Sequence, residues 1–217
     1  MVIKIAHRGI PVLEVENTLP SFKKAIKLGA DMVECDVRLS KDGKVVVIHD
    51  HTVDRTTSGK GKVSDFTYKE LQKLGVPLLY DVLKLDCKFN VEIKDYRVLN
   101  VMELNEDVLF SSDKARILMN IKKKNPKVKT SLVFSSRLLK WLLLHFADVA
   151  KVDAVSLHDK LASQKLIDKL HGHNFNVYVY TVNSTERIKE LEGFGVEGIF
   201  TDDVRLFREQ KIKSLRS

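Results

Sequence analysis

The chain has 217 residues, with 37 lysines and arginines, 29 aspartates and glutamates and a formal net charge of +8. Its length suits one barrel-sized domain over residues 1–217, its apolar runs are too short and too charged to span a membrane, and the few apolar residues before His7 are too few for a signal peptide. The two cysteines, Cys35 and Cys87, give no disulfide framework, so we expect a cytoplasmic protein in which Cys35 packs as a small apolar side chain.

The first elements form a strand–helix–strand unit. An apolar strand over residues 2–6 ends at His7, where a polar loop begins. Asn17 or Thr18 is a suitable cap for the helix that follows, because short polar side chains accept hydrogen bonds from the first helical amides. The next apolar strand, residues 33–39, completes the unit, which predicts a parallel sheet with a right-handed crossover.

A hairpin is predicted between residues 33–39 and 44–48. Asp42-Gly43 separates the two strands, and glycine accepts the positive φ that tight hairpin turns require. If these two residues alone form the loop, Asp36 lies opposite His49, whereas a looser turn shifts the pairing by a residue or two. The hairpin is therefore expected to bring an imidazole to a carboxylate.

Two acidic side chains share one face of the predicted strand 33–39. Side chains alternate along a strand, so Glu34 and Asp36 point the same way and Cys35 points the other way. The surrounding valines and isoleucines are core residues, and charge beside a buried sheet normally needs a partner or a metal ion. The pair therefore indicates a functional site.

The rest of the chain alternates between helices and strands, after a small polar excursion over residues 51–64. Further predicted strands cover 89–94, 107–111, 130–135, 153–157, 176–182 and 198–201, and predicted helices cover 66–74, 77–83, 113–124, 137–147, 160–172 and 184–193, with a last helix from Val204. About eight strands, mostly followed by helices, predict an α/β fold of the (β/α)8 TIM barrel type. An open doubly wound sheet is the alternative, but no glycine-rich phosphate fingerprint follows the first strand. The connection after Lys94 is short and predicts a degenerate helix.

Polar residues at the ends of the predicted strands converge on one rim, where TIM barrels carry their functional groups. They are His7, Arg8, Glu34, Asp36, Glu92 and Lys94, with His49 supplied by the hairpin. Three converging carboxylates repel one another, and a hard divalent cation, Mg²⁺ or Ca²⁺, relieves the repulsion. Zinc is disfavoured, because no Cys/His ligand spacing is present. The alternative is a ring of salt bridges from these carboxylates to Arg8 and Lys94.

The same rim suits phosphate chemistry. Arg8 offers a planar fork and Lys94 a point charge, and both groups bind phosphate oxygens well. His7 and His49 have ordinary pKa values near neutrality, so they suit the transfer of protons to and from a reacting group. The combination predicts phosphodiester cleavage. His158 also follows a strand and is a candidate for lining the mouth.

A set of short motifs occurs in order along nearly the whole chain. They are His7-Arg8-Gly9, Glu16-Asn17-Thr18, Glu34-x-Asp36, His49-Asp50, Asp54-Arg55-Thr56, Glu92-x-Lys94, Thr181-Val182-Asn183 and Thr201-Asp202. The ordered set resembles the glycerophosphodiester phosphodiesterase family. This resemblance implies a (β/α)8 barrel that hydrolyses glycerophosphodiesters to sn-glycerol 3-phosphate and an alcohol.

The resemblance also implies roles for individual residues. Glu34, Asp36 and Glu92 match the metal ligands, His7 and His49 match the catalytic base and acid, Arg8 and Lys94 match phosphate-contacting positions, and Glu16 and Asn17 match supporting polar residues. Tyr180 stands where the family commonly has tryptophan, so it keeps an aromatic wall and adds a hydroxyl. The expected partner is a small-molecule glycerophosphodiester, with no nucleic acid.

Two other functions stay open. One is a phospholipase D-type activity on lysophospholipids, which needs a hydrophobic groove at the barrel mouth. The other is a basic, non-enzymatic protein that binds anionic lipid or nucleic acid through lysine-rich helices. This last function predicts strongly salt-dependent binding and leaves the acidic cluster unexplained.

Overall fold

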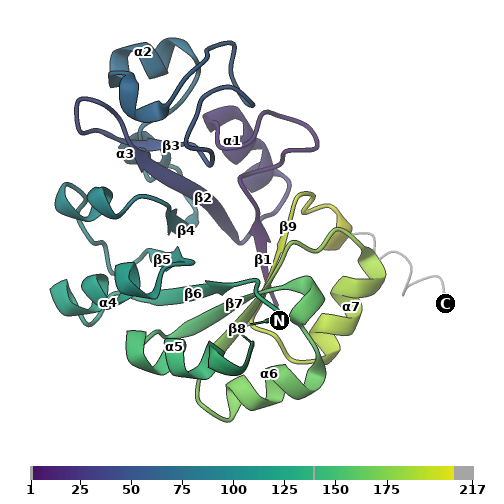
Figure 1. Ribbon diagram of the computed structural model, residues 1–217. Coiled ribbons are helices and arrows are strands. Elements are labelled where there is room, and N and C mark those ends of the chain that lie inside the picture. Colours follow the sequence, from purple (N-terminus) through teal and green to yellow (C-terminus); the bar gives the residue numbers. More distant parts are fainter. Residues whose placement is uncertain (1, 139, 208–217) are drawn as a thin grey trace.

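The computed structural model describes residues 2–138 and 140–207. Within these residues, eight parallel strands close into a barrel with helices around it (Figure 1). The strands are β1 (Ile3–Ala6), β2 (Met32–Leu39), β4 (Lys88–Ile93), β5 (Leu109–Ser112), β6 (Thr130–Phe134), β7 (Ala154–His158), β8 (Asn176–Tyr180) and β9 (Gly198–Thr201). Strand β1 pairs with β9 on one side and with β2 on the other, which closes the ring. The predicted TIM barrel is confirmed, and the open sheet is excluded.

The helices connect successive strands. They are α1 (Leu19–Lys27), α2 (Tyr68–Lys73), α3 (Leu79–Val82), α4 (Ala115–Lys124), α5 (Leu143–Ala150), α6 (Gln164–His171) and α7 (Thr185–Gly193), with 3-10 turns η1 (Val63–Asp65), η2 (Tyr96–Asn100), η3 (Lys140–Leu142) and η4 (Asp159–Leu161). The connection after Lys94 is reduced to η2, as its length predicted. The predicted helix from Val204 falls mostly outside the described residues. Among the helices described, none has both the length and the apolar composition needed to cross a bilayer.

Thr18 is the residue that caps α1. Its side chain accepts a hydrogen bond from the backbone N–H of Ser21 at 3.4 Å. The other candidate, Asn17, is buried and has a φ of 58°, so its amide turns into the barrel instead. Thr18 therefore caps the helix, whereas Asn17 points into the barrel interior.

Apolar side chains fill both sides of the barrel wall. Outward-facing residues of the strands, such as Val33, Cys35 and Val91, pack under the helices in one large core. Cys35 is fully buried there, which confirms its predicted packing, and burial holds the pKa of its thiol well above the ordinary value. A second cluster closes the barrel interior below the polar rim and consists of Ile5, Met32, Leu109, Ala154, Tyr178 and Phe200.

The hairpin differs from its predicted register by one residue. Strand β3 (Val45–Val47) pairs antiparallel with β2, and the backbone N–H of Ile48 donates to the carbonyl of Asp36 at 2.9 Å. The backbone N–H of Ser40 donates to Lys44 at 2.9 Å, so the loop has three residues and ends at Gly43 with a φ of 75°. Three-residue hairpin loops commonly place a positive φ at their last position. The two-residue loop was wrong and the looser turn is confirmed, so Ile48 rather than His49 lies opposite Asp36.

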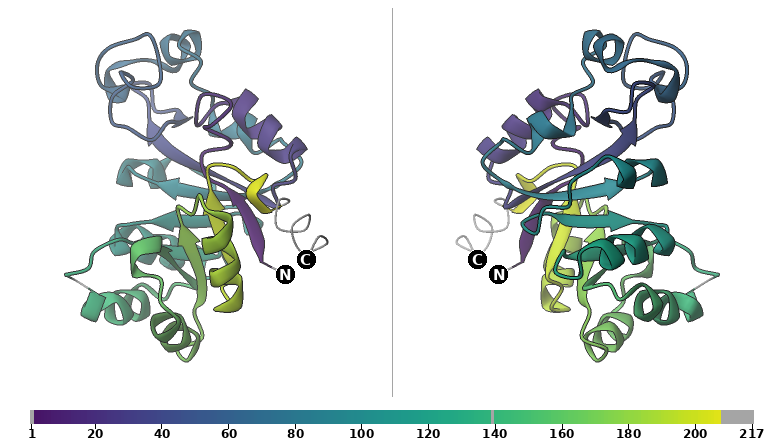
Figure 2. Two further views of the ribbon diagram at one scale, coloured as in Figure 1. Left: turned by 90° about the vertical axis from the view of Figure 1, so that its right-hand side faces the viewer. Right: turned by 90° about the vertical axis from the view of Figure 1, so that its left-hand side faces the viewer.

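The excursion after the hairpin has a small core of its own. Val53 and Val63 from this segment pack with Val46, Ile48, Leu71 and Val76. The backbone N–H of Val53 donates to Gly61 at 3.0 Å, which ties the two sides of the loop together. In both views of Figure 2 this part of the chain lies at the opposite end of the molecule from α5 and α6. The excursion is therefore a packed substructure.

Candidate active site

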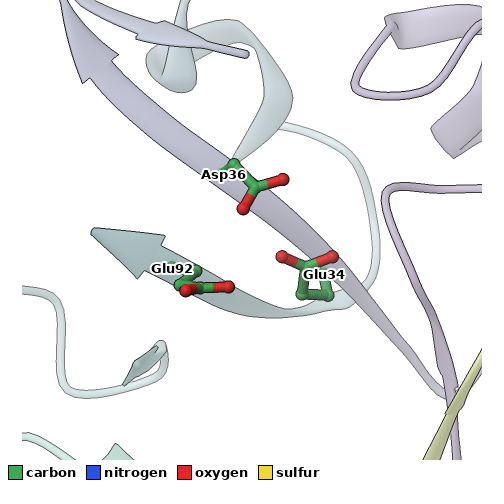
Figure 3. A group of neighbouring side chains, drawn as sticks. All are labelled: Glu34, Asp36 and Glu92. Carbon is green, nitrogen blue, oxygen red and sulfur yellow. The ribbon is translucent and has the colours of Figure 1, made fainter. Parts of the chain in front are cut away.

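The acidic triad is formed by two adjacent strands. Strands β2 and β4 run parallel, and their register sets Asp36 beside Glu92 and Glu34 beside Asn90. Ligand oxygens of Glu34, Asp36 and Glu92 all lie within 4.8 Å of one another. Figure 3 shows the two β2 carboxylates on the face that also carries Glu92. The predicted convergence of these three residues is therefore present in the fold.

The three carboxylates do not ionise equally. Burial and the charge of Asp36 raise the pKa of Glu34 to about 8. Burial and Asp36 likewise raise the pKa of Glu92. Burial opposes ionisation of Asp36 as well, but Lys94 and Arg8 outweigh it and lower the pKa of Asp36. Burial and mutual repulsion therefore oppose full ionisation of the triad.

Two cations contact the triad. The Nζ atom of Lys94 lies 2.6 Å from Glu92 and 3.2 Å from Asp36, and Nε of Arg8 lies 3.3 Å from Asp36. The backbone N–H of Arg8 donates to Glu34 at 2.8 Å. The salt-bridge ring considered from sequence is thus partly present, but it sets two cations against three carboxylates.

One buried oxygen of the triad lacks a partner. Among the described residues, Oε1 of Glu34 is buried without a hydrogen-bond donor, and Oδ1 of Asp36 is buried with only the Lys94 ammonium beside it, at 3.2 Å. An unpaired buried carboxylate oxygen is costly. The donor set consists of carboxylate oxygens only, which is the set that hard divalent cations prefer. Glu34, Asp36 and Glu92 therefore fit a divalent metal ion.

His7, at the end of β1, is held by a carboxylate from the other end of the chain. Its Nδ1 lies 2.7 Å from Oδ1 of Asp202 and donates to it, because an ionised carboxylate can only accept. Oδ2 of Asp202 accepts from the Asn183 amide at 2.6 Å. Burial opposes protonation, but Asp202 and Glu34 together raise the pKa of His7. This hydrogen bond fixes the tautomer of His7: Nδ1 carries a proton, and Nε2 is the ring nitrogen that can gain or lose one.

His49 is held by its sequence neighbour. Its Nδ1 donates to Oδ1 of Asp50 at 2.7 Å. Burial is the main reason that the pKa of His49 is lowered, although Asp36 and Asp50 act in the opposite direction. His7 and His49 both line the cavity above the triad, but each is oriented by its own carboxylate.

A chain of charged contacts continues from Asp50 to the triad. The Arg55 guanidinium donates from Nε to Asp50 at 2.6 Å and from its two terminal nitrogens to Glu16 at 2.8 and 2.7 Å. Glu16 in turn accepts from Arg8 at 3.0 Å. Arg8 contacts Asp36, so His49 and the acidic triad are connected through this chain.

Asn17 holds one member of the triad, Asp36, through its side-chain amide. Its amide nitrogen donates to Oδ2 of Asp36 at 3.0 Å, and its amide oxygen accepts from the backbone N–H of Asp36 at 3.1 Å. The positive φ of Asn17 directs the side chain into these two bonds, and asparagine adopts that conformation more readily than most residues. Asn17 therefore fixes the orientation of one carboxylate.

A cavity of about 290 Å³ opens at this rim. Its lining includes His7, Arg8, Glu34, His49, Asn90, Glu92, Lys94, Ser111, Asp113, Ser135, Ser156, His158, Tyr180 and Phe200. His158 thus lies at the mouth, as predicted, with its ring 5.6 Å from that of Tyr180. Burial is the main reason that the pKa of Tyr180 rises to about 12, so its phenol stays protonated. The cavity combines an acidic and basic side with an aromatic side.

Comparison with known proteins accords with this geometry. Residues 7–106 and 84–206 match the model of the glycerophosphoryl diester phosphodiesterase family. The chain belongs to this family.

One relative and two solved structures match this chain over nearly their full length. A glycerophosphodiester phosphodiesterase of Caldanaerobacter subterraneus is 37% identical over 231 residues, covering 92% of this chain and 93% of the relative. The crystal structure of a glycerophosphodiester phosphodiesterase from Thermotoga maritima superposes with a TM-score of 0.86 at 28% identity, covering 97% of this chain and 98% of the other. An Oleispira antarctica phosphodiesterase, solved in complex with the product sn-glycerol-3-phosphate, has a TM-score of 0.83 at 23% identity and covers 97% and 96%.

Some residues of this site were not assigned from sequence. Asp202 directly follows β9, so the strand-end rule that selected Glu92 applied to it as well. Asn90 lies two residues before Glu92 on the same face of β4 and was also left without a role. The position of Asp113 on the cavity wall follows only from barrel closure. Sequence reasoning placed the candidate residues at the rim more readily than the partners that hold them.

Proposed function

We propose that this protein hydrolyses glycerophosphodiesters to sn-glycerol 3-phosphate and an alcohol, with a divalent metal ion and two histidines. The observation that carries the proposal is the grouping of an acidic triad, two cations and two carboxylate-bound imidazoles around one cavity. Membership of the phosphodiesterase family supports the reaction type. The product bound to the Oleispira antarctica phosphodiesterase supports the substrate class.

Glu34, Asp36 and Glu92 would hold the metal ion, and Mg²⁺ and Ca²⁺ both suit an all-oxygen donor set. When bound, such an ion supplies Lewis-acid neutralisation of phosphoryl oxygens. Asn17 keeps Asp36 in the orientation that this requires. The buried Oε1 of Glu34, which has no hydrogen-bond donor, supports the assignment.

His7 acts as the general base in this scheme. Its Nδ1 donates to Asp202, so its Nε2 takes a proton from the nucleophile. The nucleophile is a water molecule or the glycerol hydroxyl of the substrate, which would give a cyclic phosphate. Asp202 stabilises the imidazolium that forms, because a carboxylate hydrogen-bonded to a protonated histidine lowers the free energy of that cation.

His49 acts as the general acid, and two cations hold the phosphate. His49 donates the proton at Nε2 to the departing alcohol oxygen while Nδ1 stays bonded to Asp50. Arg8 and Lys94 bind phosphate oxygens, and Glu16 orients Arg8. Tyr180 forms an aromatic wall of the substrate cavity.

Release of sn-glycerol 3-phosphate tests the function. The assay uses a panel of glycerophosphodiesters and lysophosphatidylcholine, with chelator and with added Mg²⁺ or Ca²⁺. We expect release from the glycerophosphodiesters, loss with chelator, and a fall of about 100-fold or more for His49→Ala. Asp81→Asn, which breaks a surface ion pair with Lys84, is the matched control. Choline release from lysophosphatidylcholine alone, or activity unaffected by chelation, would contradict the proposal.

We also propose a cytoplasmic location. Both cysteines, Cys35 and Cys87, are free in the structure. Free cysteines accord with a reducing compartment, where disulfides are rare. Fractionation of cells that express the full-length protein checks this placement, and recovery outside the cytoplasm would contradict it.

A further inference from the structure

Arg55 lies on the excursion, outside the lining of the catalytic cavity, yet its contacts reach both sides of the site. Three of its nitrogens donate to two carboxylates, Asp50 and Glu16, at 2.6 to 2.8 Å. Asp50 holds the imidazole of His49, and Glu16 holds the guanidinium of Arg8. Arg55 is therefore the bridge between the acid of the proposed reaction and its phosphate-binding cation.

The excursion does not depend on Arg55 for its own shape. Val53 and Val63 bury the apolar side of the segment, and backbone hydrogen bonds join Val53 to Gly61 and Val63 to His51. The side chain of Arg55 is about half exposed, at 48%. An exposed ion pair of this kind contributes little to folding stability. A contribution to folding stability therefore does not explain why Arg55 donates hydrogen bonds from Nε and from both terminal nitrogens.

The geometry of the bridge requires a guanidinium. A planar fork can donate to Glu16 with both terminal nitrogens while Nε donates to Asp50, whereas an ammonium offers a single charged centre. Without Arg55, Asp50 loses its second partner and is free to rotate away from Nδ1 of His49. The imidazole then loses the contact that keeps its other nitrogen directed at the substrate.

We propose that Arg55 is a positioning residue that acts through Asp50 on His49, so that the acid is placed at the leaving oxygen of the substrate. This inference rests on the proposed function. Arg55 should therefore matter when the departing alcohol needs a proton and matter much less when it does not.

The test compares two substrates in Arg55→Gln. Glycerophosphocholine releases an alkoxide that must be protonated, whereas the glycerol phosphodiester of 4-nitrophenol releases a stable phenolate. We expect kcat for glycerophosphocholine to fall about tenfold or more and kcat for the nitrophenyl substrate to fall less than about threefold. Because Glu16 also loses a partner, any rise in KM should be similar for the two substrates. Arg55→Lys, which retains the charge without the fork, should recover only part of the loss.

Further variants separate positioning from damage to the fold. Arg97→Gln is the matched control, because Arg97 makes a comparable exposed pair with Asp95 and should leave both rates unchanged. In the double variant His49→Ala, Arg55→Gln, the second substitution should lower kcat by less than about twofold beyond the first, since both act on one proton transfer. Thermal melting verifies that each variant is folded.

The outcomes are distinguishable. If the wild-type protein cleaves both substrates and Arg55→Gln loses the same factor on each, or nothing on either, the positioning role is wrong while the proposed function stands. A full additional loss in the double variant would also overturn it. If the wild-type protein cleaves neither substrate, the proposed function itself fails and the inference fails with it.

Discussion

At the scale of single residues, the site depends on pairs that hold one another. His7 and Asp202 are 195 positions apart in the chain, yet their side chains meet at 2.7 Å. Because the carboxylate accepts from Nδ1, it fixes which nitrogen of the ring can take a proton. The orientation of His7 is thus a property of the closed barrel.

Asp202→Asn tests this pair. The substitution keeps the shape of the side chain but removes its charge, so the pKa of His7 should fall, because Asp202 is one of the groups that raise it. A base works when deprotonated, so the rising acidic limb of the kcat/KM–pH profile should move to lower pH. We expect kcat to fall by about 10- to 100-fold, because the imidazolium loses its stabilising carboxylate. An unchanged pH profile would show that Asp202 does not act on His7.

The predictions for individual residues succeeded where a local rule applied. Glu34 and Asp36 share a face because strands have a period of two, and Glu92 joins them because parallel strand ends meet on one rim. Asp50 and Arg55 stood in recognised motifs, but a sequence does not state which carboxylate a guanidinium contacts. Such partners become visible only when distant loops are placed in space.

At the scale of elements, the hairpin shows how sharply one turn residue sets a register. Gly43 has a φ of 75°, and a Cβ added there would meet nothing within 4 Å. A non-glycine residue in the left-handed region costs about 1–2 kcal/mol, so strain alone determines the effect of a substitution.

Gly43→Ala should lower the free energy of unfolding by about 1 kcal/mol and the melting temperature by about 2–4 °C. Gly193→Ala is the matched control: Gly193 ends α7, has equally open surroundings and lies outside the left-handed region. This second variant should be neutral or slightly stabilising, because alanine favours helices. Equal destabilisation in differential scanning calorimetry would contradict the assignment of strain to Gly43.

A second element-scale feature joins α4, β6 and β7. Asp153 accepts from Lys122 at 2.6 Å, from Lys129 at 2.9 Å and from the backbone N–H of Thr130 at 2.9 Å. Burial opposes ionisation, but the two lysines prevail and the pKa of Asp153 is lowered. A lowered pKa means that this carboxylate stabilises the fold above its unfolded-state pKa and stops doing so as the pH falls through the folded-state value.

Asp153→Asn should therefore reduce the free energy of unfolding at pH 7 by about 1–3 kcal/mol. The difference from the wild-type protein should shrink as the pH is lowered, because both proteins then lack the charge. Urea unfolding at a series of pH values measures it, with Asp81→Asn as a surface control. A difference that stays constant down to strongly acidic pH would exclude the linkage.

At the scale of the whole molecule, the metal ion should stabilise the fold. Ligands that bind only the folded state add about 2.7 kcal/mol at a hundred times their dissociation constant. We expect Mg²⁺ or Ca²⁺ to raise the melting temperature by about 5–10 °C, measured without any substrate. Asp36→Asn should abolish the shift and Asp81→Asn should retain it. A shift that survives Asp36→Asn would place the ion elsewhere.

The barrel as a whole was predictable, but its element boundaries were not. Repeated strand–helix units favour a parallel barrel because each crossover has the same hand. The helix predicted over residues 137–147 instead divides into η3 and α5, and the hairpin loop is one residue longer than predicted. Such boundaries depend on tertiary packing and on turn geometry, which composition and periodicity do not specify.

The apolar cluster that fills the lower barrel interior determines where substrate can reach the site. Ile5, Leu109, Tyr178 and Phe200 belong to this buried plug beneath the catalytic rim. In the part of the chain that the structure describes, apolar side chains fill the barrel below the cavity, so substrate and products should pass through the opening at the polar rim. A long chain on the alcohol would extend outside this opening, so we expect turnover to be insensitive to its length.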